Sequence, residues 1–360
     1  MLIYWLLFAF FAVGAIVTQP ALAPATGLPD GRVRPAVRVP FRAVFALGAI
    51  VTIGLIGLRY KVGADWFNYV FMFDDVKRRS LTAALEVGDP AYQLLNWVTA
   101  EIGARIWLVN LISGAIFGWG LYRLASVQPS PWLAFAVAVP YLVIVVAMGY
   151  TRQSIALGVL MAGLARQSRG ASTLNFAIYA TVAAAFHKTA VVVFPLVALS
   201  GRGSRLVNFL LAVCTTILLY DYFLGDSMDM LVKNYIEAEY SSQGALTRCA
   251  MNFVPAVLLW VFKDRLGFDP HEFRIWRNFS FASIVFIILL GVLPSSTVVD
   301  RLSLYLIPLQ IVVLTRAAMI GQARLAGTVG VLAYSFAVQF VWLNFADHAR
   351  FWVPYQLFPF

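Results

Sequence analysis

Four arginines stand beside long apolar stretches of this sequence: Arg59, Arg152, Arg248 and Arg301. A guanidinium stays protonated at physiological pH, and its paired N–H donors match the geometry of a phosphate group. If the apolar stretches cross a membrane, a cation at their ends is costly and marks a functional site by default. Four such cations together predict a site that clamps a pyrophosphate or another polyanion.

The first of these arginines begins the segment RYKVGAD, residues 59–65. It combines Arg59, Lys61, a flexible glycine and Asp65, and such a loop could hold a phosphate group. The alternative is structural: the two cations extend to lipid headgroups, and Asp65 caps a following helix. We favour phosphate binding by Arg59 and Lys61, with Asp65 as a candidate general base.

Arg152 and Gln153 open another apolar stretch, where the N-terminal end of a helix would also attract an anion. Arg152 could instead be a topology anchor. However, a cation on the outer side of a membrane runs against the usual excess of basic residues inside, so we favour a functional role. Arg152 is the strongest single candidate for a catalytic anion-binding residue, and Gln153 is expected to bind substrate beside it.

His187 and Lys188 lie between two short apolar runs, where a broken helix can expose backbone groups to a cavity. An imidazole with an ordinary pKa of about 6.5 is suited to remove a proton from a hydroxyl group near neutral pH. A hydrogen-bonded histidine at the membrane interface is an equally strong alternative. His187 therefore joins Asp65 as a candidate general base, and Lys188 joins the binding residues.

Arg248 follows the polar segment SSQGALT, and Arg301 follows Asp300 at the start of a stretch that carries Tyr305 one turn later. The alternative to a binding role is that these charges pair with neighbouring helices. Adjacent residues of one helix do not face each other, so Asp300 and Arg301 would need separate partners. We expect Arg248, Arg301 and Tyr305 to contribute to substrate binding.

Other kinds of chemistry lack a sequence signal. There is no Walker loop, no His/Cys spacing for a metal, no nucleophile elbow and no dinucleotide fingerprint. Asp74 and Asp75 precede the basic run 77–79, so they make a weak metal-binding pair. Cys214 and Cys249 indicate no disulfide framework. We expect neither a metal nor a cofactor.

Composition identifies the environment in which these residues work. Of the 360 residues, 61% are hydrophobic and 12% are charged, and the mean hydropathy is +0.80. One soluble core cannot bury that much apolar surface, so the sequence predicts a polytopic membrane protein. The net charge of +10 comes from short basic clusters between apolar stretches, which argues against nucleic acid as a partner.

The apolar runs fit about twelve membrane crossings, because a helix needs about 20 residues to cross the hydrocarbon core. The predicted spans are 2–18, 41–58, 105–122, 131–148, 152–165, 172–186, 188–200, 206–221, 248–262, 277–293, 301–315 and 325–343. The first is expected to be a retained span rather than a cleaved signal. The pair 172–186 and 188–200 could instead be a single re-entrant break.

Charge gives these spans an orientation. With the N-terminus outside, more than half of the 27 Lys and Arg residues lie inside, with few of the 17 Asp and Glu residues. The bias predicts that both termini and all four arginines lie on the outer side. Two outer segments, 59–104 and 222–247, are long enough to carry interfacial helices. Residues 1–360 are predicted to form one membrane domain.

Six segments carry a resemblance to a known family. After Arg59 they are, in order, VGADWFNY, TRQSIALGVLMAGLA, FHKTAVVVFPL, SSQGALTR, DRLSLYLIPL and WVPYQLF. In these segments the chain resembles the EpsG-like, Wzy-type family of exopolysaccharide polymerases. The resemblance implies an all-α, GT-C-like transmembrane bundle in the inner membrane of a bacterium. Lys188 and the basic run 77–79 depart from the family pattern.

The resemblance also implies an activity, namely glycosyl transfer between oligosaccharide repeat units carried on undecaprenyl pyrophosphate. The donor and the acceptor are both lipid-linked, the site faces the periplasm, and export and chain-length-control proteins could be partners. The family pattern falls on Arg59, Asp65, Arg152, Gln153, His187, Arg248, Arg301 and Tyr355. We expect an inverting, metal-independent transfer in which the arginines hold the pyrophosphate.

Two other classes of protein fit the same pattern. A transporter or flippase for a lipid-linked or anionic solute would also place polar residues near broken helices, but in both halves of the bilayer. Here the candidates gather on the outer side, which favours an enzyme. An O-antigen-ligase-like or acyl-modifying enzyme would share both the topology and the anion site, so this alternative stays open.

Overall fold

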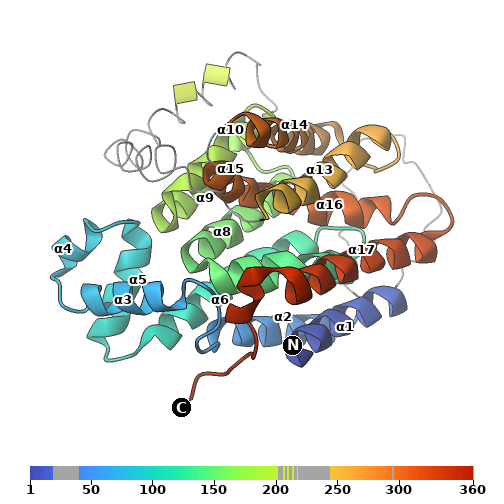
Figure 1. The fold of residues 1–360 in the computed structure, drawn as a ribbon. Coiled ribbons are helices and arrows are strands. Elements are labelled where there is room, and N and C mark those ends of the chain that lie inside the picture. The colour runs from blue at the N-terminus through green and yellow to red at the C-terminus, as the bar shows by residue number, and fades with distance from the viewer. Residues whose placement is uncertain are drawn as a thin grey trace.

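The computed structural model describes residues 1–18, 40–201, 244–293 and 296–359, with a few isolated positions between 206 and 217. Within these ranges the chain is built of helices, and strand pairing is limited to an isolated bridge between Arg59 and Leu357. The predicted all-α fold is confirmed. Figure 1 shows the long helices side by side in a bundle, with a smaller group of helices beside one end.

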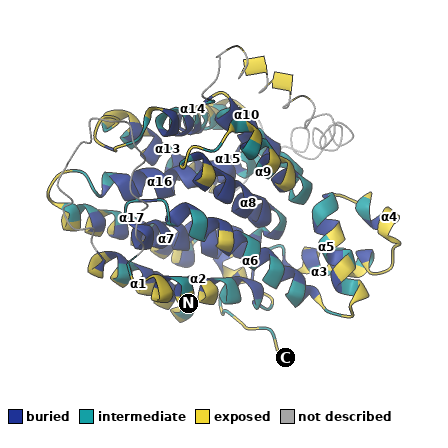
Figure 2. Ribbon diagram, turned by 180° about the vertical axis from the view of Figure 1, so that it is seen from behind, coloured by how far each residue is buried: buried dark blue, intermediate teal, exposed yellow. Residues whose placement is uncertain are grey.

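The centre of the bundle is a helix that is buried on every side. It consists of α7, Pro131–Ala138, which continues as a π-helix, η1, over Val139–Ala147. Every residue of this helix is buried, as expected for a helix that is apolar all round. α1, Leu2–Val17, packs along α7. Figure 2 shows the buried centre in dark blue and exposed residues on the outer helices.

Three packed helices position several of the candidate residues. α2, Arg42–Gly57, packs on α6, Ile106–Ala125, and α6 packs on α8, Thr151–Gln167. The axes of α6 and α8 approach closely because a glycine from each helix faces the other. A Cβ atom on Gly120 would lie 1.8 Å from the carbonyl oxygen of Gly158. Small residues at such contacts allow membrane helices to pack backbone to backbone.

The break predicted between residues 186 and 188 is confirmed. α9, Thr173–Phe186, ends at His187, whose backbone is extended. A 3-10 helix, η2, follows over Lys188–Val192 and leads into α10, Val193–Ala198, which packs back against α9. The chain therefore turns at His187 and returns through a segment shorter than a full membrane crossing.

The C-terminal half adds α13 (Ala245–Val261), α14 (Pro270–Val292), α15 (Ser296–Ser303), η5 (Leu304–Leu306), α16 (Pro308–Ala317), α17 (Arg324–Phe345) and η6 (Asp347–Phe351). α14 starts before the predicted span 277–293, because the Asp269 carboxylate caps it by accepting hydrogen bonds from two backbone N–H groups. The predicted span 301–315 is not one straight helix. α15 and η5 meet α16 at an angle of 50°, at Pro308, which has no N–H to continue the helix.

The segment 59–104, predicted to lie outside, folds into three short helices: α3 (Trp66–Val76), α4 (Leu81–Leu85) and α5 (Pro90–Glu101). α3 is amphipathic, since it buries an aromatic stripe and leaves Phe67 and Phe71 exposed. The prediction of helices in this segment is confirmed. The other outer segment, 222–247, lies outside the described residues as far as residue 243.

Among the described residues, three helices are long and apolar enough to cross a membrane, namely α6, α14 and α17, with 20, 23 and 22 residues. The bent pair formed by α15–η5 and α16 would make a fourth span. Shorter apolar segments are α1, α2, α7–η1, α9, η2–α10 and α13. The predicted span 152–165 lies in α8, and the predicted span 206–221 lies largely outside the described residues. These apolar helices make the chain a membrane protein.

Candidate functional site

The two ends of the chain meet at one end of the bundle. The Tyr4 hydroxyl, in the first turn of α1, donates a hydrogen bond to the Trp352 carbonyl oxygen at 2.8 Å. The Tyr60 backbone N–H, just after α2, donates to the Gln356 carbonyl oxygen at 2.8 Å. The C-terminal tail therefore lies against the RYKVGAD segment, and Figure 1 shows both termini at the same side of the bundle.

Asp89 is the centre of a charged cluster at this end. Its carboxylate is 2% exposed. Arg152 Nη1 donates to Oδ2 at 2.7 Å, and the Lys188 backbone N–H donates to Oδ1 at 3.1 Å. His187 Nδ1 lies 3.4 Å from Oδ2. These contacts join the start of α5, the first turn of α8 and the turn after α9. We call Asp89, Arg152, His187 and Lys188 the Asp89 cluster.

Burial and charge set the protonation states in the Asp89 cluster. Burial by itself raises the pKa of Asp89, but His187, Arg152 and the Lys188 N–H hold that pKa below its usual range. An ionised carboxylate only accepts hydrogen bonds, so His187 Nδ1 carries the proton and Nε2 is free to accept one. Burial, with the charges of Arg152 and Arg301, lowers the pKa of His187 despite the adjacent carboxylate. The imidazole is therefore neutral at pH 7.

Arg301 brings a further cation to the same end. Its guanidinium carbon lies 4.2 Å from the centroid of the Tyr150 ring, a cation–π contact. Gln153 Nε2 donates to the Arg301 carbonyl oxygen at 2.8 Å and so fastens α15 to α8. No carboxylate of the described ranges forms a salt bridge with Arg301. Because its charge acts on His187, Arg301 lies close to the Asp89 cluster.

Arg248 and Asp300 form a bidentate ion pair between α13 and α15. Arg248 Nη2 donates to Asp300 Oδ2 at 2.7 Å, and Nε donates to Oδ1. Paired N–H donors on one carboxylate hold both side chains in a defined orientation. One alternative from the sequence is that these charges pair with residues of neighbouring helices, and Asp300 forms such a pair. Arg301 follows Asp300 in α15 and takes no part in this ion pair.

Arg59 faces the interior of the bundle, and only 1% of it is exposed. Its Nη2 donates to Asn110 Oδ1 at 3.2 Å and to Thr151 Oγ1 at 2.8 Å. Its Nη1 donates to the Ile56 carbonyl oxygen. These bonds fasten α2 to α6 and α8 directly beneath Arg152. The sequence places Arg59 correctly at the end of α2, but its contacts are with the protein.

The rest of the RYKVGAD segment forms a tight loop at the same end. Gly63 has a φ of +104°, and a Cβ there would lie 2.4 Å from the Met148 carbonyl oxygen, so glycine allows the loop to pass close to the end of η1. Lys61 is exposed. Asp65 is half-buried and close enough for its charge to act on Arg301. The loop thus adds a carboxylate near Arg301.

Two tyrosines that were expected to bind substrate lie in the layer beneath the Asp89 cluster and the loop. Tyr305 is 1% exposed, and its hydroxyl lies 3.2 Å from Thr189 Oγ1 in η2. The Tyr355 hydroxyl donates to the Leu55 carbonyl oxygen in α2 at 2.7 Å. Both side chains connect the elements that carry the charged residues.

The structure brings Arg152, His187 and Arg301 together, with Asp65 nearby, and it adds Asp89, which sequence reasoning missed. In the sequence, the Gly-Asp-Pro triplet is typical of a helix start, with Asp at the N-cap and Pro at the first helical position. The Asp89 side chain makes no capping bond and is directed to α8 and the turn after α9 instead. Only the tertiary structure reveals that use of the carboxylate.

The chemistry available at this end comes from an imidazole and several guanidinium groups. A neutral histidine can transfer a proton, and fixed guanidinium groups can stabilise a developing negative charge. Within the described part of the chain, no group of three His, Cys, Asp or Glu side chains could hold a metal ion.

Comparison with known proteins gives one match. The model of the EpsG family matches residues 42–357, a range that contains the Asp89 cluster, the RYKVGAD loop and Arg301. No curated protein and no solved structure matches the chain.

Proposed function

Because the chain belongs to the EpsG family, we propose that it is a glycosyltransferase that polymerises oligosaccharide repeat units carried on undecaprenyl pyrophosphate. One observation carries the proposal. His187 is held neutral by burial and contacts the Asp89 carboxylate, which also accepts a hydrogen bond from Arg152. A base and fixed cations at one end of a membrane bundle are what glycosyl transfer from a lipid pyrophosphate requires.

The proposed setting is the inner membrane of a bacterium, with the site and both termini on the periplasmic side. About twelve crossings in a GT-C-like arrangement would include the shorter apolar helices and the span 206–221. Contact of the N-terminal turn with the C-terminal tail supports placing both termini on one side. The bias of basic residues towards the other side supports the orientation.

In the proposed reaction, His187 Nε2 removes the proton from the attacking hydroxyl of the acceptor sugar. The hydroxyl oxygen bonds to the anomeric carbon of the donor, and the bond from that carbon to the pyrophosphate oxygen breaks. The lipid pyrophosphate leaves with the electron pair, and a single displacement inverts the configuration. Asp89 stabilises the imidazolium that forms. Asp65, half-buried near Arg301, is the second candidate for the base.

Arg301 and Arg152 are proposed to hold the leaving pyrophosphate. Arg301 forms no salt bridge with a described carboxylate, so its charge is available to a ligand. The Arg152 side chain is 32% exposed, and its buried Nε has no hydrogen-bond partner among the described residues. A phosphate oxygen would satisfy that donor. Lys61, Lys188 and Arg248 are proposed to contact the substrate at the rim.

The opposite end of the bundle supports a one-sided site over a transport path. There, Arg316 of α16 pairs with Glu272 of α14 at 2.7 Å, and the two side chains are 5% and 3% exposed. Arg316 Nη1 also donates to the Gly267 carbonyl oxygen at 3.2 Å. Such a buried ion pair serves packing between helices rather than solute passage.

The test is incubation of the purified protein in lipid nanodiscs with repeat units on undecaprenyl pyrophosphate. We expect a ladder of longer glycans, and a fall in initial rate of roughly 10²-fold or more for His187→Ala. His348→Ala, which changes an exposed histidine in η6, is the matched control and should retain the ladder.

Three outcomes would refute the proposal. Folded wild-type protein that elongates nothing would exclude a polymerase. Transfer of one unit to a different lipid acceptor, without a ladder, would indicate a ligase. Movement of the lipid-linked unit across a vesicle membrane without elongation would indicate a flippase.

A further inference from the structure

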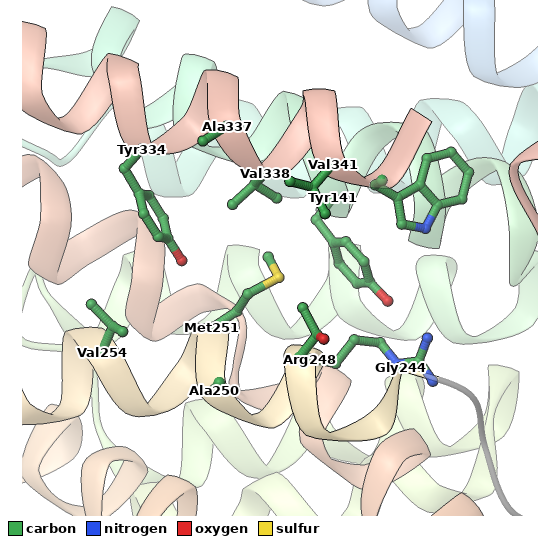
Figure 3. Close-up of a pocket in the computed structure, with 12 residues that line it drawn as sticks. Tyr141, Gly244, Arg248, Ala250, Met251, Val254, Tyr334, Ala337, Val338 and Val341 are labelled. Atoms are coloured by element: carbon green, nitrogen blue, oxygen red, sulfur yellow. The ribbon is translucent and has the colours of Figure 1, made fainter. Parts of the chain in front are cut away.

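A cavity of about 330 Å³ lies between α13 and α17. Figure 3 shows Tyr334, Val338 and Val341 of α17 on one side, facing Met251 and Val254 of α13 on the other. Its lining is formed mainly by small, branched and aromatic side chains. The walls therefore suit a hydrocarbon ligand.

The cavity opens towards the lipid side of the bundle. Val254 and Val341 line it and are 41% and 50% exposed, and Trp260, almost two helical turns further along α13, is 37% exposed. Exposed apolar side chains on a membrane helix face acyl chains. A long hydrocarbon can thus enter the cavity sideways from the bilayer, with its remainder left among the lipids.

One end of the cavity is charged. Arg248 lines this end and pairs with Asp300, and Arg301 follows in the chain. The Arg301 guanidinium carbon lies 4.2 Å from the centroid of the Tyr150 ring. The Arg248 guanidinium marks where the apolar walls end, and the nearby Arg301 guanidinium forms no salt bridge with a carboxylate of the described residues. This is the arrangement that binds an amphiphile with an anionic head.

We propose that this cavity binds the isoprenoid segment next to the phosphate in a polyprenyl pyrophosphate carrier, with the head group at Arg301. The inference rests on the proposed function for the identity of the carrier. A cavity of this size is at the lower end of ligand pockets, which span about 300–1,000 Å³, so it encloses only the first few isoprene units. The cavity therefore recognises the isoprene units of the carrier that lie nearest to the reacting sugar.

The test uses a diazirine-labelled farnesyl pyrophosphate as the probe and the full chain in nanodiscs. Ala333 and Ala337, one turn apart on α17, are both exposed, but only Ala337 lines the cavity. Ala337→Phe fills the cavity and should lower photolabelling at least tenfold. Ala333→Phe adds the same ring to the same helix and should leave labelling unchanged. Peptide mapping should place the label on α13 and α17.

The label should be displaced by unlabelled undecaprenyl pyrophosphate and not by phosphatidic acid, and a diazirine-labelled farnesol should label at least tenfold less. The proposal would be overturned by labelling outside α13 and α17 or by equal labelling of both variants. It would also be overturned if phosphatidic acid displaced the label equally or if the alcohol labelled equally. Binding is read without turnover, so the two proposals fail separately. Specific labelling of the cavity without elongation would refute only the polymerase assignment. Elongation by Ala337→Phe at the wild-type rate would refute only the cavity assignment.

Discussion

Asp89 and Arg59 lie at the same end of the bundle but differ in the exposure of the residues that they contact. Arg59 is enclosed, and its hydrogen bonds run to α2, α6 and α8, so it supports packing. Asp89 is equally buried, but two of its partners, Arg152 and His187, remain partly exposed. The buried carboxylate thus holds a group that can transfer a proton and a cation at the same site, with both accessible to a ligand.

Asp89→Asn tests that role. The amide keeps the shape but removes the charge that pairs with Arg152 and fixes the His187 tautomer, so the elongation rate should fall by roughly 10²-fold or more. The rate is measured as the initial velocity of ladder formation. Asp75→Asn is the matched control, because Asp75 forms an exposed pair with Arg79. Equal rates for the two variants would show that Asp89 is dispensable.

The dependence of the rate on pH follows from the lowered pKa of His187. A general base must be neutral, so the rate should fall with decreasing pH around a midpoint below 6.5. The Arg301 charge lowers the pKa of His187 and the Asp89 charge raises it. Arg301→Gln should therefore move the midpoint to higher pH, and Asp89→Asn should move it to lower pH. Shifts in the same direction would assign the midpoint to another group.

At the scale of helices, the site depends on how closely α6 and α8 pack. Arg152 stands in the first turn of α8, and Asn110 in α6 helps to hold Arg59 beneath it. The close approach of these helices requires glycine at 120 and 158, where any side chain would meet backbone. The position of the Asp89 cluster is thus set partly by two residues that have no chemistry of their own.

Gly120→Ala should destabilise the protein, because its Cβ would overlap the Gly158 carbonyl group. Overpacking of this kind costs about 1–3 kcal/mol or more, so the thermal unfolding midpoint in detergent should fall by several degrees. Gly330→Ala in α17, where a Cβ meets nothing within 4 Å, should leave the midpoint unchanged or raise it. A midpoint for Gly120→Ala at or above that of wild type would show that α6 and α8 separate without cost.

At the scale of the whole molecule, residues from both ends of the chain close the same end of the bundle. Trp352 accepts a hydrogen bond from Tyr4 and donates one from Nε1 to the Ile144 carbonyl oxygen in η1 at 2.7 Å. The C-terminal tail therefore reaches the central helix as well as the RYKVGAD loop. Contacts between such distant parts of the chain make the termini part of the structure that supports the site.

Reporter fusions test the proposed orientation. A periplasm-sensitive reporter placed after residue 360 should be active, because the tail lies at the end that holds the Asp89 cluster. A cysteine in place of Lys77, exposed after α3, should react with an impermeant maleimide in intact cells, and one in place of Arg324 at the start of α17 should not. The reverse pattern would place the site on the cytoplasmic side.

Helix boundaries mark the limit of what hydropathy predicts. A run of apolar residues locates α6 and α17 well, since each is long enough to cross the hydrocarbon core by itself. Hydropathy alone missed the first turns of α14, which are polar, and treated the bent pair of α15 and α16 as one span. Both errors arise from local hydrogen bonding, namely the cap formed by Asp269 and the missing N–H of Pro308. A hydropathy average over a window of residues does not detect such features.

The sequence by itself determined that this is an all-helical membrane protein with four arginines beside apolar stretches, because composition and hydrophobic run length decide the solvent of each segment. It could not determine which of those arginines share a site. Long-range packing decides which arginines share a site. It buries Arg59, pairs Arg248 with Asp300 and leaves Arg301 without a salt bridge to a described carboxylate. Packing also made Asp89, which sequence reasoning did not single out, the centre of the cluster, because its partners come from elements distant in sequence.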